Sequence, residues 1–357
     1  MDSKERVVSF PRYADYHVVF KYTVEQGFGL QYVVPPETTS RTEKLGEKYS
    51  PEFVCTPFKT MLGGMIEALE SGANTLITSY GLCRLGYFGE LQEQIIKDLG
   101  YDFEIINFQE YNTGKKKDFI KAVKALNPDV NLVKLGAELI NAKTMLEYID
   151  DITAEYYKKA GFEITGGDAK KIYDTFIFDL SLCENREEIK SAYSKAKEGF
   201  RNLDIKIPQD PIKVGVVGEF YTAMDPFSNR NLEEKLTKMG VEVHRYLNIT
   251  NRLFNYDKKA LKKYIEEYAT YEMGPTSTAN IWATKKYCES GVDGIVHIKS
   301  ANCTPEIDIV PVMRNVCADY KVPFITLTYD AQTSDVGLNT RIEAFFDMMS
   351  AKRKVIY

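Results

Sequence analysis

The stretch Gly294-Ile-Val-His-Ile-Lys-Ser-Ala-Asn-Cys-Thr-Pro305 decides the fold class of this chain. Residues 294–299 form a short apolar run, which is typical of a strand buried inside a sheet. Residues 300–303 leave this strand as a loop that ends in Cys303. The spacing of apolar residues after the loop predicts a helix over 305–320. A strand, a loop and a helix in this order are the building unit of a parallel α/β sheet.

The same alternation extends along the chain on both sides of this stretch. Further strands are expected at 5–10, 30–34, 75–79, 102–108, 212–217, 241–246 and 323–329, and further helices at 14–25, 57–71, 88–99, 230–239 and 338–351. Residues 114–205 are rich in Lys, Glu, Ala, Tyr and Leu and carry few strand signals. We therefore predict an N-terminal α/β lobe over 1–113, a mainly helical middle segment and connector over 114–211, and a C-terminal α/β lobe over 212–357.

The composition narrows the class of protein. The chain has 357 residues, of which 44% are hydrophobic, so it can bury real cores. A net charge of −5 gives no electrostatic reason to expect nucleic acid as a partner. The sequence has no apolar run long enough to cross a membrane, and its first residues lack the apolar core of a signal peptide. We expect a soluble, cytoplasmic protein that does not bind a membrane.

The cysteines suggest a site built from distant segments. No two of them have the CxxC spacing of a zinc ribbon or a local ferredoxin-type cluster, and a disulfide framework is not expected in the cytosol. With three histidines, a His-rich metal site is not indicated either. The cysteines are Cys55, Cys83, Cys183, Cys288, Cys303 and Cys317.

The tripeptide Cys-Thr-Pro occurs twice, at 55–57 and at 303–305. Thr is a good N-cap and Pro is favoured at the first helical position, so each Cys is expected just outside a helix N-terminus. The unpaired N–H groups and the positive end of the helix dipole favour a thiolate there. A thiolate can bind a metal or attack an electrophile.

Three cysteines stand where a ligand site of an α/β protein forms. Cys83 and Cys303 follow predicted buried strands, and Cys55 precedes a helix. Because sites in open parallel sheets lie outside the carboxyl ends of the strands, these thiols could converge between the two lobes. Three thiolates without histidine fit a soft metal centre, of which iron–sulfur is the commonest large one. The alternative is that each is a small apolar filler. The other three cysteines are predicted to lie on helices as structural residues.

Other polar residues are candidates for the same site. Arg84 follows Cys83 directly and could neutralise a reduced cluster or bind an anion. Gly218-Glu219-Phe220-Tyr221, with Asn229, resembles a ligand loop but has no GxGxxG pattern. Asp330 and Gln332 follow the last predicted strand. The catalytic candidates are Arg84, Glu219, Asp330 and Gln332. No GxxxxGK[ST] motif occurs, so an ATPase activity would have to come from another protein.

Taken together, the spaced motifs resemble those of the 2-hydroxyacyl-CoA dehydratases and the activase-related proteins associated with them. The motifs are Cys55-Thr-Pro-Phe-Lys, Gly81-Leu-Cys83-Arg-Leu-Gly-Tyr87, Gly218-Glu-Phe-Tyr221 with Asn229, Ser300-Ala-Asn-Cys303-Thr-Pro, and Ser334-Asp-Val-Gly337 with Thr340-Arg-Ile-Glu-Ala-Phe345. The resemblance implies two Rossmann-like lobes and a [4Fe–4S] cluster between them, held by Cys55, Cys83 and Cys303. It also implies low-potential electrons from an ATP-hydrolysing Fe–S activase, and a homodimer as a plausible assembly.

Four functions remain open at this point. The first is an iron–sulfur redox component that works with the activase, and the second is a subunit of a 2-hydroxyacyl-CoA dehydratase acting on an acyl-CoA substrate. The third is a reductase of small molecules with a double-cubane [8Fe–9S] cluster, which needs six ligands. It ranks below a single cubane because Cys183, Cys288 and Cys317 are predicted on helices. The fourth is a non-redox binding or scaffold protein. The sequence has no recognisable CoA-binding signature.

Overall fold

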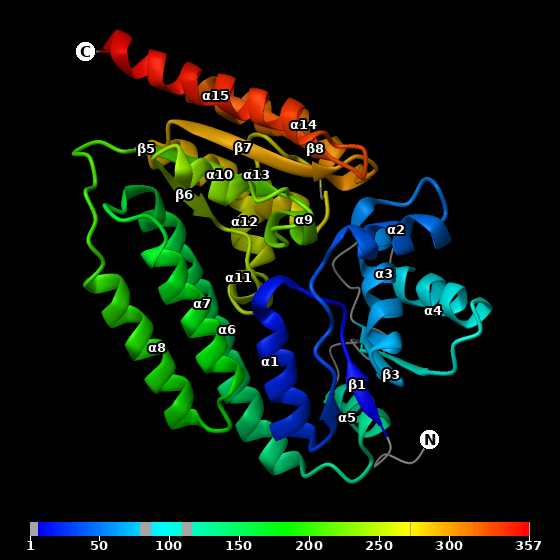
Figure 1. Ribbon diagram of the computed structural model, residues 1–357. Helices are drawn as coiled ribbons and strands as arrows, with labels where there is room; N and C mark the ends of the chain where they lie inside the picture. The colour runs from blue at the N-terminus through cyan, green and yellow to red at the C-terminus, as the bar shows by residue number, and fades with distance from the viewer. Residues whose placement is uncertain (1–5, 79–86, 109–115, 272, 357) are drawn as a thin grey trace. The chain divides into compact units, whose positions relative to one another are not determined.

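The computed structural model describes residues 6–78, 87–108, 116–271 and 273–356 (Figure 1). The chain divides into two compact units. The N-terminal unit comprises Met1–Ile149 and Ile177–Tyr193, and the C-terminal unit comprises Asp150–Phe176 and Ser194–Tyr357. Each unit therefore consists of two stretches of the chain, and the stretches of the two units alternate along the sequence.

The N-terminal unit is built on four parallel strands in the order β2-β1-β3-β4. These are β1 (Val7–Ser9), β2 (Gln31–Tyr32), β3 (Thr75–Thr78) and β4 (Glu104–Asn107). The helices of this region are η2 (Ala14–Tyr16), α1 (His17–Tyr22), the π-helical turn η3 (Thr23–Phe28), α2 (Ser40–Tyr49), α3 (Thr56–Glu70), α4 (Phe88–Asp98) and α5 (Lys116–Leu126). Val8 of the inner strand β1 lies between Tyr32 and Thr75 in register, and it packs with Val24 and Leu126 in the core.

The C-terminal unit has the same arrangement, with four parallel strands in the order β6-β5-β7-β8. They are β5 (Ile212–Gly218), β6 (Val241–Arg245), β7 (Gly294–Ser300) and β8 (Phe324–Tyr329). The helices around this sheet are α9 (Phe220–Met224), α10 (Leu232–Lys238), α11 (Ile249–Leu253), α12 (Lys258–Tyr264), α13 (Pro275–Glu289), α14 (Thr304–Asp319) and α15 (Asp335–Ile356). Side chains of α13 and α14 share a core with Val217 and Ile295, while α15 packs against Gly294 on the opposite face of β7.

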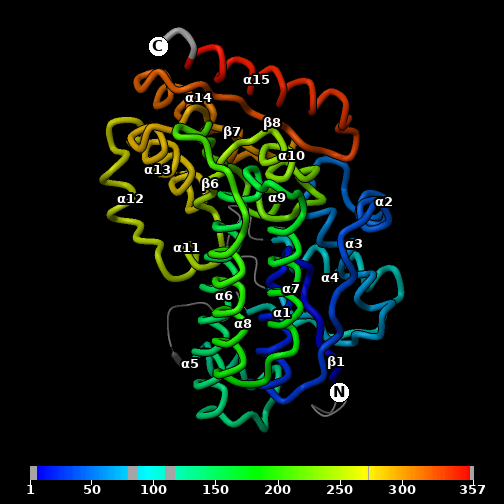
Figure 2. Tube along the Cα trace, turned by 60° about the vertical axis from the view of Figure 1, so that its left-hand side comes forward, coloured from blue at the N-terminus to red at the C-terminus, as the bar shows by residue number. Residues whose placement is uncertain are grey.

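Long helices form the middle of the chain, and Figure 2 follows them along the trace. They are α6 (Leu132–Lys159), α7 (Asp168–Ser181) and α8 (Arg186–Arg201), with the short turn η4 (Ala160–Phe162) after α6. The Tyr148 and Tyr193 rings stack with centroids 3.8 Å apart, which joins α6 to α8 in the N-terminal unit. Lys197 pairs with Asp151 at 3.1 Å, which joins the same two helices in the C-terminal unit.

The predicted fold class is confirmed: two Rossmann-like units with parallel sheets and a helical insert. Two helices show where the structure differs from the sequence prediction. Helix α2 was not expected, because Leu45 is its one large aliphatic residue and the apolar periodicity of a helix is absent. The last helix begins at Asp335 rather than at 338 and runs further. Among the described residues, no helix combines the length and the apolar character needed to span a membrane.

Candidate functional site

The candidate site of the C-terminal unit lies where the strand order changes direction. From β5 the chain passes to β6 on one side and later to β7 on the other, so the carboxyl ends of β5 and β7 flank a switch point. Gly218 ends β5 with a φ of +151°, and an added Cβ would lie 2.0 Å from the Ile298 carbonyl oxygen of β7. A glycine is therefore required there, and it brings the loop after β5 close to the loop after β7.

Cys303 occupies the N-cap position of α14. Its backbone is extended, with φ −80° and ψ 94°, and its carbonyl oxygen accepts the bond from Ile307 N at 3.0 Å. Thr304 and Pro305 are the first helical residues. The predicted assignment, with Thr as N-cap and Pro at the first helical position, is thus shifted by one residue. Pro fits here as well, because N–H groups throughout the first turn lack intrahelical partners. The half-buried Cys303 is therefore closer to the helix dipole than predicted.

A fully buried polar network contacts the first turn of α14 and holds it in place. Glu306, in the first turn of α14, accepts a hydrogen bond from His297 Nε2 at 2.8 Å. It also accepts from Asn280 Nδ2 of α13 at 3.0 Å, and the same amide reaches Gly218 O at 2.7 Å. Asn280 Oδ1 accepts from Gly218 N at 3.1 Å. His297, Asn280 and Glu306 are at most 1% exposed. The network therefore ties the Cys303 helix to both strands at the switch point.

Lys299 places a cation beside Cys303. It lies near the end of β7, and its side chain is half-buried. Burial lowers the pKa of Lys299, while the nearby Cys303 and Glu306 act in the opposite direction. Burial therefore disfavours the charged form of this amine, and negative charge at Cys303 or Glu306 favours it.

Glu219 is the N-cap of α9, directly after Gly218. Its carboxylate accepts hydrogen bonds from Tyr221 N at 3.0 Å, Thr222 N at 2.7 Å and Thr222 Oγ1 at 2.6 Å. Burial raises the pKa of Glu219 against the effect of these hydrogen bonds, and the neighbouring Glu306 raises it further. The candidate therefore lies at the switch point, where it caps a helix and retains a proton more readily than a free carboxyl.

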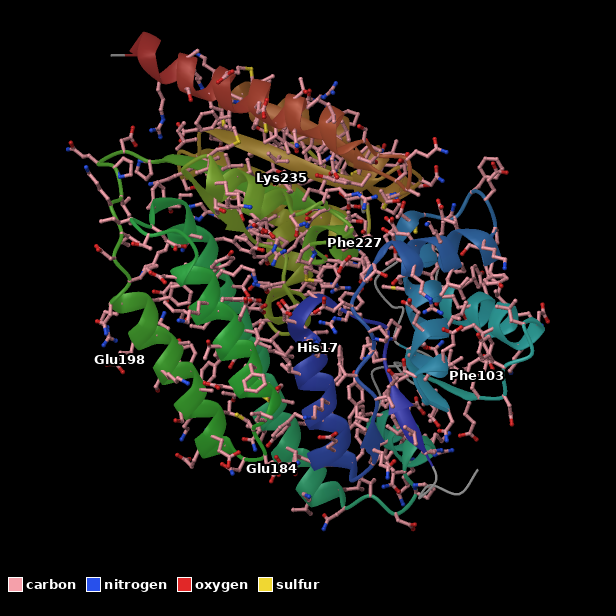
Figure 3. The ribbon with its side chains drawn as sticks, viewed as in Figure 1. His17, Phe103, Glu184, Glu198, Phe227 and Lys235 are labelled. Carbon is pink, nitrogen blue, oxygen red and sulfur yellow. The ribbon has the colours of Figure 1, made fainter. Side chains whose placement is uncertain are left out.

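Asp330 and Gln332 follow β8 and form a tight turn. Asp330 Oδ1 accepts from Gln332 N at 2.9 Å and from Thr333 Oγ1 at 3.0 Å, while Asp330 N donates to Thr333 Oγ1 at 2.8 Å. Further along lies Lys235 of α10, which Figure 3 labels. Its Nζ is 3.3 Å from Oδ1 of Asp335 at the start of α15. These contacts assign Asp330 a role in the turn, and the side chain of Gln332 is exposed.

Cys55 has the same local setting in the N-terminal unit. It is the N-cap of α3, with φ −69° and ψ 157°, and Thr56 and Pro57 again begin the helix. The side chain is half-buried. Helix α3 is fixed from two sides. Glu67 accepts from Arg41 of α2 at 2.8 Å and from Thr42 Oγ1 at 2.6 Å. The buried Gln92 of α4 donates to Phe58 O at 3.0 Å.

The other cysteines differ from these two. Cys288 and Cys317 lie on α13 and α14, as predicted, in the buried core of the C-terminal unit. Cys183 was predicted on a helix, but α7 ends at Ser181 and α8 begins at Arg186, so it lies in the turn between them. The sequence around it continues the helical composition, and the turn was therefore missed. Burial raises the pKa of Cys183 to about 11, which disfavours a thiolate.

Cys83 and Arg84 lie outside the described residues. Within the described ranges, no group of three His, Cys, Asp or Glu side chains is placed to hold a metal ion. The convergence of Cys55, Cys83 and Cys303 therefore stays a prediction.

Sequence reasoning missed Asn280, Lys299 and Glu306. The sequence did contain a hint of Lys299 and Glu306 as site residues. Lys299 is a charged residue at the end of an apolar strand, and Glu306 directly follows Cys-Thr-Pro. Nothing in the sequence pointed to Asn280, because its hydrogen-bond partners Gly218 and Glu306 are distant in sequence. His297 is a fully buried core residue.

Comparison with known proteins places these features in a family. A family model described as 2-hydroxyglutaryl-CoA dehydratase, D-component, matches residues 138–349, which is more than half of the chain. The match includes Cys303 and the whole switch point of the C-terminal unit. No curated protein sequence matches the chain. The protein therefore belongs to the family of the 2-hydroxyglutaryl-CoA dehydratase D-component.

Proposed function

We propose that this protein is an iron–sulfur redox subunit of the 2-hydroxyacyl-CoA dehydratase type. In this proposal Cys55, Cys83 and Cys303 hold a [4Fe–4S] cluster, and a separate ATP-hydrolysing Fe–S activase supplies low-potential electrons. The observation that carries the proposal is the position of Cys303, a half-buried N-cap at the switch point within the residues that match the family. Family membership itself supports a dehydratase subunit.

The residues around Cys303 fit the donor chemistry of such a cluster. Iron–sulfur clusters are held by thiolates, and the N-cap setting of Cys303 and of Cys55 favours a thiolate in both units. When bound, the cluster would supply one-electron transfer. Lys299 would offset the negative charge beside Cys303, and the buried pair of His297 and Glu306 would keep the helix start in place.

Glu219 provides a group that can hold a proton at the same edge of the sheet. Because burial raises the pKa of Glu219, its carboxyl stays protonated to a higher pH than a free one. A dehydration removes a proton and a hydroxide from the substrate, so a group that exchanges a proton near the cluster is useful there. Asp330 is a weaker candidate, because its carboxylate holds the turn after β8.

A single cubane agrees better with the structure than a double cubane. A double cubane would need all six cysteines as ligands. Cys288 and Cys317 are 6% and 2% exposed in the core of the C-terminal unit, away from the carboxyl ends of the strands. The high pKa of Cys183 adds to this argument, because a ligand must be a thiolate.

Anaerobic isolation with iron and sulfide quantitation and an EPR spectrum tests the proposal. We expect about four irons per chain after reconstitution. The substitutions Cys55→Ser, Cys83→Ser and Cys303→Ser should each lower the iron content and change the EPR signal. Cys183→Ser is the matched control and should retain the iron of the wild type. An iron-free protein after anaerobic reconstitution, or equal iron in all four variants, would contradict the proposal.

Substrate and partner are tested separately. A 2-hydroxyacyl-CoA should alter the EPR spectrum of the reconstituted protein if it binds near the cluster. Reduction of the cluster should require the activase together with ATP. If a chemical reductant reduces the cluster but activase and ATP do not, the cluster assignment stands and the electron-transfer partner is wrong.

A further inference from the structure

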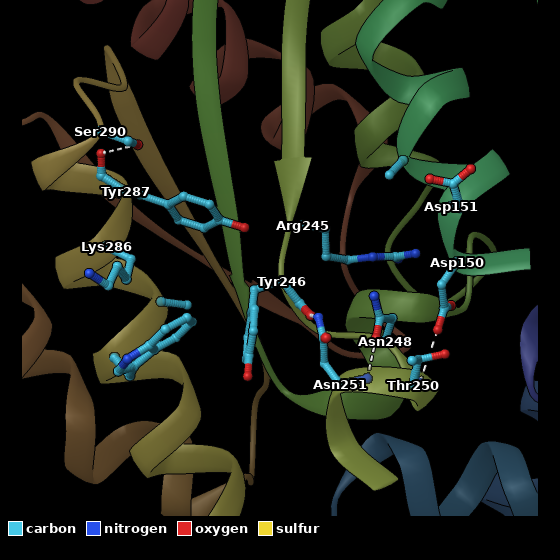
Figure 4. A pocket seen from close by; sticks show the side chains of 13 residues that line it. Asp150, Asp151, Arg245, Tyr246, Asn248, Thr250, Asn251, Lys286, Tyr287 and Ser290 are labelled. Carbon is cyan, nitrogen blue, oxygen red and sulfur yellow. Dashed lines mark hydrogen bonds between the residues drawn. The ribbon is translucent and has the colours of Figure 1, made fainter. Parts of the chain in front are cut away.

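A cavity of about 540 Å³ opens in the C-terminal unit, at the carboxyl end of the edge strand β6 (Figure 4). It lies between the last part of α6, helix α11 and helix α13. None of the described cysteines lines it, and neither Gly218 nor Glu219 does. Its volume is in the range of small-molecule sites. The cavity is thus separate from the switch point between β5 and β7.

Aromatic rings form one side of this cavity. The rings of Tyr246 and Trp282 meet with centroids 4.6 Å apart at an angle of 51°, and both side chains are half-buried. Tyr287 projects from α13 on the same side (Figure 4). It packs so closely on β5 that an added Cβ on Gly215 would lie 2.4 Å from the ring. These rings are fixed by the fold and present faces on which a planar ligand can stack.

Hydrogen-bonding groups form the opposite side, where Figure 4 shows Asn248 and Thr250. Asn248 caps α11 through its Oδ1, which accepts from Asn251 N at 2.7 Å. Its Nδ2 donates to no protein group in the part of the chain that the structure describes. Thr250 N donates to Asp150 Oδ2 at 2.9 Å, but Thr250 Oγ1 is buried without a hydrogen-bond partner among the described residues. Buried hydroxyl groups normally have a partner, so a ligand is a natural candidate for this one.

The cations that line the cavity are already paired with carboxylates. The Arg245 guanidinium contacts Glu233 at 3.1 Å. Asp151 is paired with Lys197 at 3.1 Å, and Lys286 at the exposed rim lies 3.3 Å from Glu289. Each of the two cations that line the cavity thus has a carboxylate partner. The site therefore favours a neutral ligand over a phosphate or a carboxylate.

We propose that this cavity binds a neutral planar heterocycle with hydrogen-bonding groups along one edge, the chemistry of a purine nucleoside. The ring stacks on Tyr246 and Trp282, and its polar edge meets Asn248 and Thr250. The nucleoside is either a free molecule or the nucleoside part of a larger one. This proposal goes beyond the iron–sulfur function and does not depend on it.

Trp282 makes the test direct, because it is the only tryptophan of the chain. We expect a saturable change of its fluorescence when adenosine is added to the full-length protein, and none with ribose. AMP should bind no more tightly than adenosine, because the lining cations are already paired. Isothermal titration calorimetry provides a second readout. Competition by CoA would identify a nucleoside that is part of a larger molecule, and absence of competition would identify a free one.

Two variants connect the binding to the cavity. Tyr246→Leu removes a stacking face and should weaken adenosine binding about tenfold. Thr250→Val removes one hydroxyl and should weaken it roughly fivefold. Tyr271→Leu and Thr340→Val are the matched controls, because both side chains are exposed and neither lines the cavity. The proposal is overturned if adenosine causes neither a fluorescence change nor heat, if AMP binds more than tenfold tighter, or if Tyr246→Leu binds like its control.

Discussion

The carboxylate of Glu306 shows how much one buried residue can hold in place. It is 1% exposed and accepts hydrogen bonds from His297 and Asn280. Replacing it with Leu would leave His297 Nε2 buried without its acceptor and would leave Gly218 O as the remaining acceptor of Asn280 Nδ2. We expect Glu306→Leu to lower the free energy of unfolding by about 3 kcal/mol. Urea denaturation of the cluster-free protein, followed by circular dichroism, measures this.

Two comparisons sharpen this prediction. Glu306→Gln keeps an oxygen acceptor for Asn280 and should cost less than the Leu variant. Glu343→Leu on the exposed side of α15 should change the stability by no more than about 0.5 kcal/mol. If Glu306→Leu is as stable as Glu343→Leu, the network does not support the Cys303 helix as described.

Cys183 allows a test by pH. Burial disfavours its thiolate and raises its pKa to about 11, compared with about 8.5 for a free thiol. The thiolate fraction near neutral pH is therefore lower by about two orders of magnitude. Alkylation of Cys183 by iodoacetamide, followed by mass spectrometry, should be slow in the folded protein and still accelerate as the pH rises past 8.5. The urea-unfolded protein is the reference, and equal rates in both states would refute the prediction.

For single residues, the sequence predicted where a side chain lies in the fold better than which distant residues it contacts. The position of Cys303 after a buried strand followed from apolar patterning and from the rule for parallel sheets. Its support by Glu306 and Asn280 did not, because those residues are separated by 26 positions and meet only through the packing of α13 on α14. The N-cap shift by one residue reflects the freedom of Pro within the first turn.

Among the elements, the pair of helices α2 and α3 sets the position of Cys55. Their backbones approach so closely that an added Cβ on Gly63 would lie 2.0 Å from the Thr42 carbonyl oxygen. On the adjacent Gly64 the nearest atom would be Thr42 Cγ2, at 4.0 Å. Gly63→Ala should therefore destabilise the protein by about 2 kcal/mol through overpacking. Gly64→Ala should stabilise it by about 0.5–1 kcal/mol, because Ala suits a helix better than Gly.

Urea unfolding midpoints of the two variants, measured side by side, test this pair of predictions. The substitutions are chemically identical and one residue apart, so each is the control for the other. Shifts of the same sign and size would mean that α2 does not pack on α3 through Gly63.

The elements that the sequence predicted well have a clear pattern of apolar residues, either a continuous run in a strand or a helical spacing. The apolar strands β5 and β7 and the amphipathic helix α8 are examples. Helix α2 has no such pattern. It forms because Thr39 and Thr42 make a capping box and because Arg41 and Thr42 bind Glu67 of α3. Those interactions depend on a helix that comes later in the chain.

On the scale of the whole molecule, the stability of the C-terminal unit depends on residues before 212 as well as on those after it. Lys206 N donates to Phe162 O at 2.8 Å, and Thr250 N donates to Asp150. An added Cβ on Gly161 would lie 2.5 Å from Thr237 O of α10, so η4 packs directly on this unit. We therefore expect the fragment 150–357 to unfold cooperatively at a higher urea concentration than the fragment 212–357.

Circular dichroism of both fragments during urea titration measures this difference. The longer fragment contains every residue of the C-terminal unit, and the shorter one lacks the helices that cover α10 and β6. Equal midpoints would show that 212–357 is an independent domain and that the middle segment adds nothing to its stability.

Two parallel sheets and a helical insert were predictable, because the strands and most of the helices carry their own apolar patterns. It was not predictable that residues of the helical insert belong partly to one unit and partly to the other. Lys21 Nζ donates to Ser181 O at 2.8 Å across 160 positions, and neither residue signals this contact in the sequence. Contacts of this kind depend on the final packing, so local patterns do not reveal them.

The interleaving of the two units has a consequence for synthesis on the ribosome. The N-terminal unit includes Ile177–Tyr193, which is translated after Asp150–Phe176 of the C-terminal unit. Domains usually fold one after another as they emerge, the N-terminal one first. Here the N-terminal unit is incomplete until residue 193 has left the exit tunnel. During that interval the apolar surface that Leu180 and Ile189 help to bury has no cover from this segment.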